Sequence, residues 1–299
     1  MTPVFPHFKP VALGDRDQVH QRLQQFGPQT SELTFTNLYM WQPFAGTRWS
    51  VWRDWLLLVC HDHAGRSYGL PPVGPGDRVA AACTLLEWLR DAGGAEAAIE
   101  RADAALADAA RSQATLAVVE TRDHFDYLYQ RGALAALSGR AYHHKKNHVN
   151  RFWKTHVAAY APLDAAHVSA CLAAADQWCR AHHCCQDSGL TGEWQAIQRA
   201  LRAWDALQLQ GGVLLVEGQV CAFSFGEMLT ADTAVVHVEK ADAAIPELYA
   251  VINQQCCAEA WPSATYVNRE QDLGDAGLRQ AKESYHPVRL IPKYTIALT

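Results

Sequence analysis

Three strand-like segments follow one another closely in the second half of the chain, and they constrain its fold more than any other feature. They cover residues 211–216, 219–227 and 233–239. Glu217-Gly218 forms a tight turn between the first two, which is typical of an antiparallel meander. Pro246 then fits the first turn of a helix that runs to residue 261, because a proline there loses no needed hydrogen bond. The second half is therefore expected to combine a sheet with packed helices.

Helices and strands also alternate on either side of this meander. Apolar residues at three- and four-residue spacing predict helices over 164–182 and 192–209. The pattern after the meander predicts a strand at 265–268, a helix at 275–284 and a final strand at 288–297. The first half shows helix patterns at 15–26, 77–91 and 95–111, a hairpin at 47–52 and 55–60, and strands at 116–120 and 125–129. The chain is therefore predicted to be an α+β protein with mixed α and β structure in both halves.

The composition agrees with a folded protein of two domains. The chain has 299 residues, of which 49% are hydrophobic and 19% are charged, so it can bury a large core and is not a disordered or low-complexity protein. No apolar stretch approaches the ~20 residues of a membrane span. Nine cysteines without regular spacing indicate free thiols in a reducing compartment, and a cytoplasmic location is expected. We expect an N-terminal domain at 1–138, a linking helix at 139–160 and a C-terminal domain at 161–299, the last with the active cleft.

Positive charge is concentrated in the linking helix. The chain has a net charge of −5, yet residues 139–154 contain no acidic residue and five basic ones: Arg140, Lys145, Lys146, Arg151 and Lys154. On a helix, Tyr142, Lys145, Val149 and either Phe152 or Trp153 share one side, so aromatic residues anchor the segment while basic residues project from it. The segment is either a candidate site for RNA phosphates or another anion, or a solvated helix between domains.

Three motifs resemble a known family. They are SELTFTNLYMW at 31–41, the segment from Leu134 to Tyr142 with the following HHKKNHVNRF, and YVNREQDLG at 266–274. All three are similar to a soluble bacterial family related to the C-terminal domain of phosphatidylglycerol lysyltransferases, and more distantly to Fem-type aminoacyltransferases. The resemblance implies two GNAT-like acyltransferase folds in tandem, each a mixed, mostly antiparallel sheet flanked by helices, with a degenerate first copy. In that fold a parallel strand pair splays apart around the acyl donor.

The resemblance leaves three possible functions. GNAT acetyltransferases hold the coenzyme A pyrophosphate at the start of the central helix on a glycine-rich loop, but residues 237–246 contain no glycine and two nearby carboxylates, Glu239 and Asp242. An aminoacyl-tRNA donor needs no such loop and no further cofactor, so transfer of an aminoacyl group to an amine or hydroxyl of a small or lipid-like acceptor is the first hypothesis. An acetyl-CoA-dependent N-acetyltransferase is the second. A non-catalytic module that binds an anionic ligand or RNA is the third.

The candidate site residues lie in the second half, near predicted strand ends and on the last predicted helix and its exit. Glu270 and Asp272 follow a predicted strand and are candidate proton acceptors, while Tyr285 resembles in position the general acid of GNAT enzymes. The candidate substrate-binding residues are Asn268, Arg269, Glu239, Lys240, Lys282 and His237. The same arginine and carboxylates are also consistent with a network that only fixes the loop. His182-His183-Cys184-Cys185 lacks the spacing of a metal site, so no metal is expected.

Overall fold

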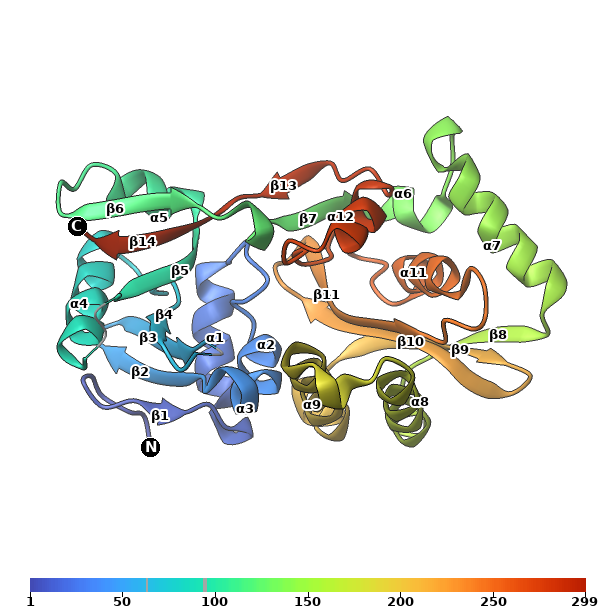
Figure 1. Cartoon of the computed structure of the whole chain (residues 1–299), viewed down its shortest axis with the longest axis horizontal. Helices are drawn as coiled ribbons and strands as arrows, with labels where there is room; N and C mark the ends of the chain where they lie inside the picture. The colour runs from blue at the N-terminus through green and yellow to red at the C-terminus, as the bar shows by residue number, and fades with distance from the viewer. Residues whose placement is uncertain (63, 94–95) are drawn as a thin grey trace. The chain divides into compact units, whose positions relative to one another are not determined.

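The computed structural model describes residues 1–62, 64–93 and 96–299 and divides the chain into two compact units. Unit 1 contains Met1–Asp126, Gln271–Asp275 and Ile291–Thr299. Unit 2 contains Tyr127–Glu270 and Ala276–Leu290. Each unit has a seven-stranded sheet with helices packed on it (Figure 1). In the described part of the chain, no helix is long and apolar enough to cross a membrane.

The sheet of unit 1 is mixed. Its strands, in spatial order, are β1 (Lys9–Pro10), β2 (Arg48–Trp52), β3 (Trp55–His61), β4 (Ser67–Gly69), β5 (Ala98–Asp103), β14 (Lys293–Leu298) and β6 (Leu116–Glu120). β4 and β5 run parallel, whereas the other neighbours run antiparallel. The helices of this unit are α1 (Arg16–Phe26), α2 (Phe35–Met40), α3 (Gln42–Ala45), α4 (Arg78–Asp91) and α5 (Ala104–Ala110), with 3₁₀ turns η1 (Leu13–Asp15) and η2 (Arg122–His124).

Local sequence signals explain where these helices begin. The carboxylates of Asp77 and Asp103 accept hydrogen bonds from backbone amides in the first turns of α4 and α5, and Thr34 does the same for α2. Leu85 and Leu106 then lie in the apolar core between these two helices and the sheet. Capping therefore sets the helix starts, and burial holds the helices on the sheet.

The sheet of unit 2 repeats this pattern of strand directions. Its strands are β13 (Arg289–Ile291), β7 (Asp126–Gln130), β12 (Tyr266–Asn268), β11 (Thr233–Ala241), β10 (Gln219–Met228), β9 (Gln210–Val216) and β8 (Ala158–Pro162). β8 to β11 form an antiparallel meander, β11 and β12 are parallel, and β12 and β7 are antiparallel. The predicted three-stranded meander is thus confirmed, with a fourth strand added.

Helices cover both faces of the unit 2 sheet. They are α6 (Arg131–Ala136), α7 (His143–Thr155), α8 (Val168–Ala181), α9 (Ser188–Arg202), α10 (Trp204–Leu207), α11 (Leu248–Glu259) and α12 (Ala276–Glu283), with 3₁₀ turns η3 (Arg140–Tyr142) and η4 (Cys184–Gln186). α11 lies on one face, and α8 and α9 lie on the other (Figure 1). Val251 and Ile252 of α11 are fully buried in the apolar core.

The two units exchange one strand each. In each sheet, the strand next to the parallel pair comes from the other half of the chain. In unit 1 it is β14, which lies beside β5, and in unit 2 it is β7, which lies beside β12. The unit border therefore lies at Asp126, not at the predicted residue 138. The predicted linking helix at 139–160 belongs to unit 2, where it is the shorter α7 followed by strand β8.

Two predicted elements are wrong in detail. The predicted final strand at 288–297 is two strands in different sheets, because Pro292 interrupts it. The predicted helix at 95–111 is strand β5 followed by the shorter α5, and residues 94 and 95 lie outside the described residues. All nine cysteines are free thiols in the structure.

Candidate active site

The parallel strands of unit 2 separate directly beside a β-bulge. β11 and β12 pair only from Thr233 to Val235, and β11 then continues without β12 to Ala241. The register of β11 against β10 shifts at His237, which is the extra residue of the bulge. Gly226 is required opposite it, because a Cβ atom there would overlap the carbonyl oxygen of Val235. The bulge places the His237 side chain at the point where the strands separate.

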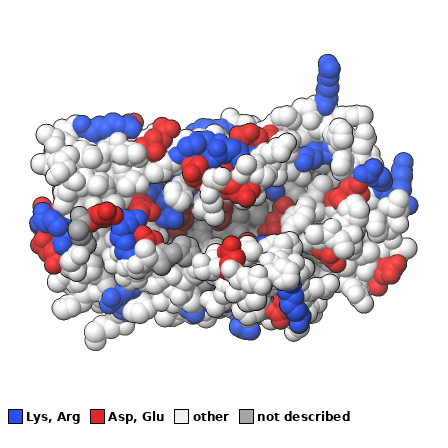
Figure 2. Space-filling model, in the orientation of Figure 1, with Lys and Arg blue, Asp and Glu red and all other residues white. Residues whose placement is uncertain are grey.

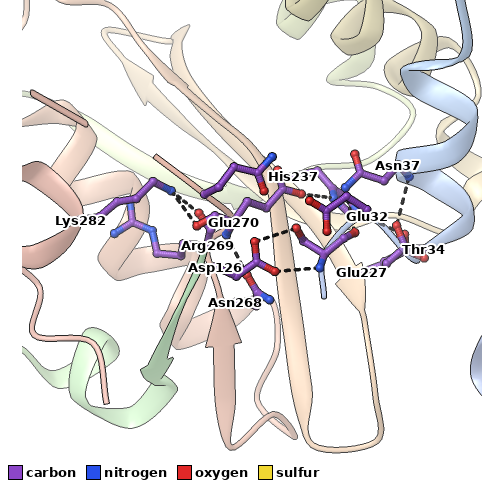
Figure 3. A network of polar contacts seen from close by, with 12 residues as sticks. Glu32, Thr34, Asn37, Asp126, Glu227, His237, Asn268, Arg269, Glu270 and Lys282 are labelled. Carbon is purple, nitrogen blue, oxygen red and sulfur yellow. Dashed lines mark hydrogen bonds and ion pairs between the residues drawn. The ribbon is translucent and has the colours of Figure 1, made fainter. Parts of the chain in front are cut away.

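His237 is held between two carboxylates (Figure 3). Its Nδ1 lies 2.9 Å from Oε1 of Glu270, and its Nε2 lies 3.0 Å from Oε1 of Glu227. The imidazole is fully buried, whereas Glu270 is 19% exposed. Burial lowers the pKa of His237, but the hydrogen bonds to Glu227 and Glu270 outweigh it and raise the pKa to about 9. The ring is therefore an imidazolium at neutral pH.

A second ion pair spans the same opening. Nη2 of Arg269 lies 2.9 Å from Oε1 of Glu239, and Nδ2 of Asn253 donates to the other oxygen of this carboxylate at 3.1 Å. The guanidinium lies 4.9 Å from the ring centroid of Tyr285. Burial disfavours the charged guanidinium, yet Glu239 raises the pKa of Arg269, so it stays charged. Burial also raises the pKa of Tyr285 to about 12, which keeps its hydroxyl protonated.

Two predicted substrate-binding residues shape the loop that carries Glu270. Glu270 has a left-handed backbone with φ of +55°, which strains a non-glycine residue. Its backbone amide donates to Oδ1 of Asn268 at 2.8 Å, and Nζ of Lys282 donates to the carbonyl oxygens of Arg269 and Glu270. Asn268 and Lys282 are both buried. They position Glu270, and three hydrogen bonds with these two residues stabilise its strained backbone.

Asp272 and Lys240 pair with residues outside this cluster. Asp272 belongs to unit 1, where its fully buried side chain pairs with Arg122 at 3.2 Å and accepts from the amide of Gly274. These contacts favour the loop-fixing alternative over the predicted catalytic role of Asp272. Lys240 faces α8 and α9, where it lies 2.8 Å from Glu193 and 3.4 Å above the ring centroid of Trp178.

The five predicted anion-binding residues divide into two groups. Lys145 turns inward and lies 4.3 Å from the ring centroid of Tyr285, and Arg151 pairs with Glu247 ahead of α11. Arg140, Lys146 and Lys154 are exposed. Figure 2 shows basic side chains projecting from the surface in the region of α7. Tyr142, Val149 and Phe152 anchor the helix, as its pattern predicts.

Glu227 and Asn253 belong to this cluster, although no motif identifies them in the sequence. Glu227 stands at the end of an apolar strand, and a carboxylate in that position could have identified it as a candidate site residue. Asn253 lies in the buried face of α11, and its Oδ1 accepts no hydrogen bond within the described part of the protein. Among residues 1–62, 64–93 and 96–299, no three His, Cys, Asp or Glu side chains converge on a common point as metal ligands.

Unit 1 contains a separate buried charge cluster built on the motif at 31–41. Nζ of Lys293 in β14 is fully buried and lies 2.6 Å from Asp126 and 2.7 Å from Glu32. Ser31 donates to both oxygens of Asp126, through its amide at 2.8 Å and its hydroxyl at 3.0 Å. The motif thus fixes the last strand of the chain in the sheet of unit 1.

Comparison with known proteins agrees with this architecture. The family model described as "Phosphatidylglycerol lysyltransferase, C-terminal" matches residues 23–297. A conserved protein of unknown function from Bacteroides thetaiotaomicron VPI-5482 is 33% identical over 100% of both chains, with a TM-score of 0.91. L-PGS from Bacillus licheniformis is 13% identical, covers 95% of this chain and 92% of its own, and has a TM-score of 0.66.

A solved structure also shares the tandem arrangement. A tandem GNAT protein from the clavulanic acid biosynthesis pathway is 10% identical over 97% of both chains, with a TM-score of 0.51. The fold is therefore a tandem GNAT-like fold, as the motifs predict. No curated protein sequence is significantly similar to this chain.

Proposed function

Because the chain belongs to the family of phosphatidylglycerol lysyltransferase C-terminal domains, we propose that it is a transferase that moves an aminoacyl group from aminoacyl-tRNA to an amine or hydroxyl of a small or lipid-like acceptor. The observation that carries this proposal is the buried Glu227–His237–Glu270 array beside the bulge. It places an ionised imidazolium against a carboxylate that solvent can reach at the point where the two strands separate.

Glu270 and Tyr285 take the two proton-transfer roles in this proposal. The acceptor's nitrogen or oxygen attacks the ester carbonyl, and its proton passes to the Glu270 carboxylate. The bond between the carbonyl carbon and the ribose oxygen then breaks, and the protonated hydroxyl of Tyr285 supplies a proton to that oxygen. His237 fixes the orientation of Glu270 through the hydrogen bond from its Nδ1.

The start of α11 supports an aminoacyl donor over coenzyme A. Glu247 immediately precedes this helix, and its carboxylate is paired with Arg151 and lies 3.9 Å from His148. A carboxylate at a helix N-terminus occupies the position that favours a phosphate group in GNAT enzymes. A tRNA donor instead needs a basic surface, which the exposed Arg140, Lys146 and Lys154 of the α7 region provide.

A donor-consumption assay tests this function. Purified protein is incubated with bacterial tRNA charged with labelled amino acids and with either anionic phospholipid vesicles or small amines, and products are identified by mass spectrometry. We expect a labelled acceptor from the wild type and a loss of roughly 100-fold or more in rate for Glu270→Gln, since a positioned proton acceptor contributes about 10²–10⁴-fold.

Asp272→Asn is the matched control, because it changes a carboxylate two residues away that lies in unit 1. We expect it to lower the melting temperature while the rate of the folded protein stays near that of the wild type. Consumption of acetyl-CoA in place of aminoacyl-tRNA would favour the N-acetyltransferase alternative. Binding of tRNA without consumption of either donor would favour a non-catalytic module.

A further inference from the structure

We propose that α7 carries a binding site for a divalent transition-metal ion, formed by His144 and His148. The two residues are four positions apart and lie on one side of the helix. Nδ1 of His144 is 3.1 Å from Nε2 of His148, and the ring centroids are 5.3 Å apart. Imidazole nitrogens bind Zn²⁺ at about 2.0–2.1 Å, so two of them at about 90–110° around one ion lie roughly 2.9–3.4 Å apart. The observed separation therefore fits two bonds to a shared ion.

The surroundings of His148 favour the neutral ring with a free Nε2, which is the form that binds a metal ion. Burial lowers the pKa of His148, so the ring is neutral at physiological pH and retains a lone pair. Oε1 of Glu247 lies 3.9 Å from Nδ1 of His148. A carboxylate on that side favours the proton on Nδ1 and leaves Nε2 for the ion, which is the usual arrangement around metal-bound histidines.

Metal binding replaces the contact between the two rings. In the free protein, one ring nitrogen donates its proton to the other across the 3.1 Å contact. With a metal bound, His144 binds through Nδ1 with its proton on Nε2, and His148 binds through Nε2 with its proton on Nδ1. Each ring keeps one proton, so the exchange is a change of tautomer.

The charges around the pair select the kind of ion. Lys145 and Arg151 lower the pKa of His148 through their positive charge and also repel cations, and Glu247 opposes them. Ions that bind mainly by charge, such as Mg²⁺ and Ca²⁺, are therefore disfavoured, whereas Cu²⁺, Ni²⁺ and Zn²⁺ form strong bonds to imidazole. His144 is exposed and His148 is 39% exposed, so an ion can enter and water can complete its coordination.

Titration calorimetry with the metal salts alone tests the site on the full chain without a histidine tag. We expect the wild type to bind one Ni²⁺ or Cu²⁺ per chain at pH 7.5, and His144→Asn or His148→Asn to weaken this binding at least tenfold. His143→Asn is the matched control, because this histidine lies in the same helix but has Asn147 at the fourth position. It should bind like the wild type.

Two further measurements separate a specific site from scattered binding by the 14 histidines of the chain. Nitrogen NMR of the imidazoles should show the metal at Nε2 of His148, and Glu247→Gln should lower the affinity roughly tenfold or more. Equal affinities of all the histidine variants, or no saturable binding by a folded wild type, would overturn the proposal. Metal binding is measured without any donor or acceptor, so it is independent of the proposed transferase activity.

Discussion

His237 shows how a single residue depends on its neighbours for its charge. Its imidazole is fully buried, which by itself disfavours the imidazolium, yet two carboxylates within 3.0 Å keep it charged. Replacing it would leave Glu227 and Glu270 without the cation between them. The residue is therefore both a part of the candidate site and a contributor to the stability of unit 2.

The stability of the protein should consequently depend on the ionisation of His237. Its pKa is raised from 6.5 to about 9 on folding, so its stabilising effect is complete below pH 6.5 and is lost as the pH rises through 9. Urea unfolding should show a fall of roughly 3 kcal/mol in the free energy of unfolding between pH 6.5 and 9.5. His237→Gln should lack this fall, and the difference between the two proteins removes the contribution of the cysteines. Parallel pH profiles for both proteins would contradict this account.

Among single residues, the sequence identifies part of the candidate site. Glu270, Arg269, Glu239 and His237 stand at or near strand ends, and the structure brings them together. Asp272 could not be assigned correctly, because the left-handed backbone at Glu270 and Leu273 redirects the chain into unit 1.

Among the elements, α7 is the one whose role depends most on which side chains face solvent. The sequence does not distinguish among the five basic residues as candidates for anion binding. In the structure, two of them have partners within unit 2, namely Tyr285 for Lys145 and Glu247 for Arg151. The other three are exposed. Replacing Lys145 or Arg151 would therefore mix a loss of packing with a loss of surface charge.

A triple variant, Arg140→Ala, Lys146→Ala and Lys154→Ala, isolates the surface charge. If this surface binds tRNA phosphates, the slope of log affinity against log salt concentration should become less steep by about two to three, since each contact contributes roughly 0.7–0.9. Filter binding at several salt concentrations measures the slope. The exposed arginines Arg90, Arg180 and Arg289 provide the control triple. Equal slopes for both triples would exclude α7 as the RNA surface.

The elements also show why sequence patterns succeed or fail. The meander was predictable because alternation and tight turns are local signals. Residues 98–103 were predicted as helix because alanine favours helices, yet burial of Ile99 and Ala102 between neighbouring strands overrides that preference. Pro292 was a visible strand breaker, but which sheet each side of it joins depends on pairing with β7 and β5, far away in the sequence.

At the scale of the whole molecule, each sheet is completed by a strand from the other half of the chain, β7 or β14. Unit 1 needs β14 between β5 and β6, and Lys293 of this strand pairs with the fully buried Asp126 and the partly buried Glu32. Loss of one partner of a buried ion pair costs about 3–5 kcal/mol, and here a strand is lost as well.

A chain that ends at Leu290 should therefore fail to fold unit 1. We expect rapid proteolysis within residues 1–126 by limited trypsin digestion, while fragments of unit 2 persist. Addition of a peptide covering residues 291–299 should restore protection. The same peptide with Lys293→Met should restore it less, and equal restoration would show that the ion pairs add nothing beyond the apolar contacts. Full protection of the truncated chain would show that β14 is dispensable.

The exchanged strands also impose an order on folding during synthesis. A ribosome releases the sequence from its N-terminus, so residues 1–126 emerge before β14 and cannot close their sheet until that strand has emerged as well. Unit 2 has all its residues available once Leu290 has emerged. The half of the protein that is translated first is thus the half that finishes folding last, and until then it exposes the edges of β5 and β6 to other nascent chains and to chaperones.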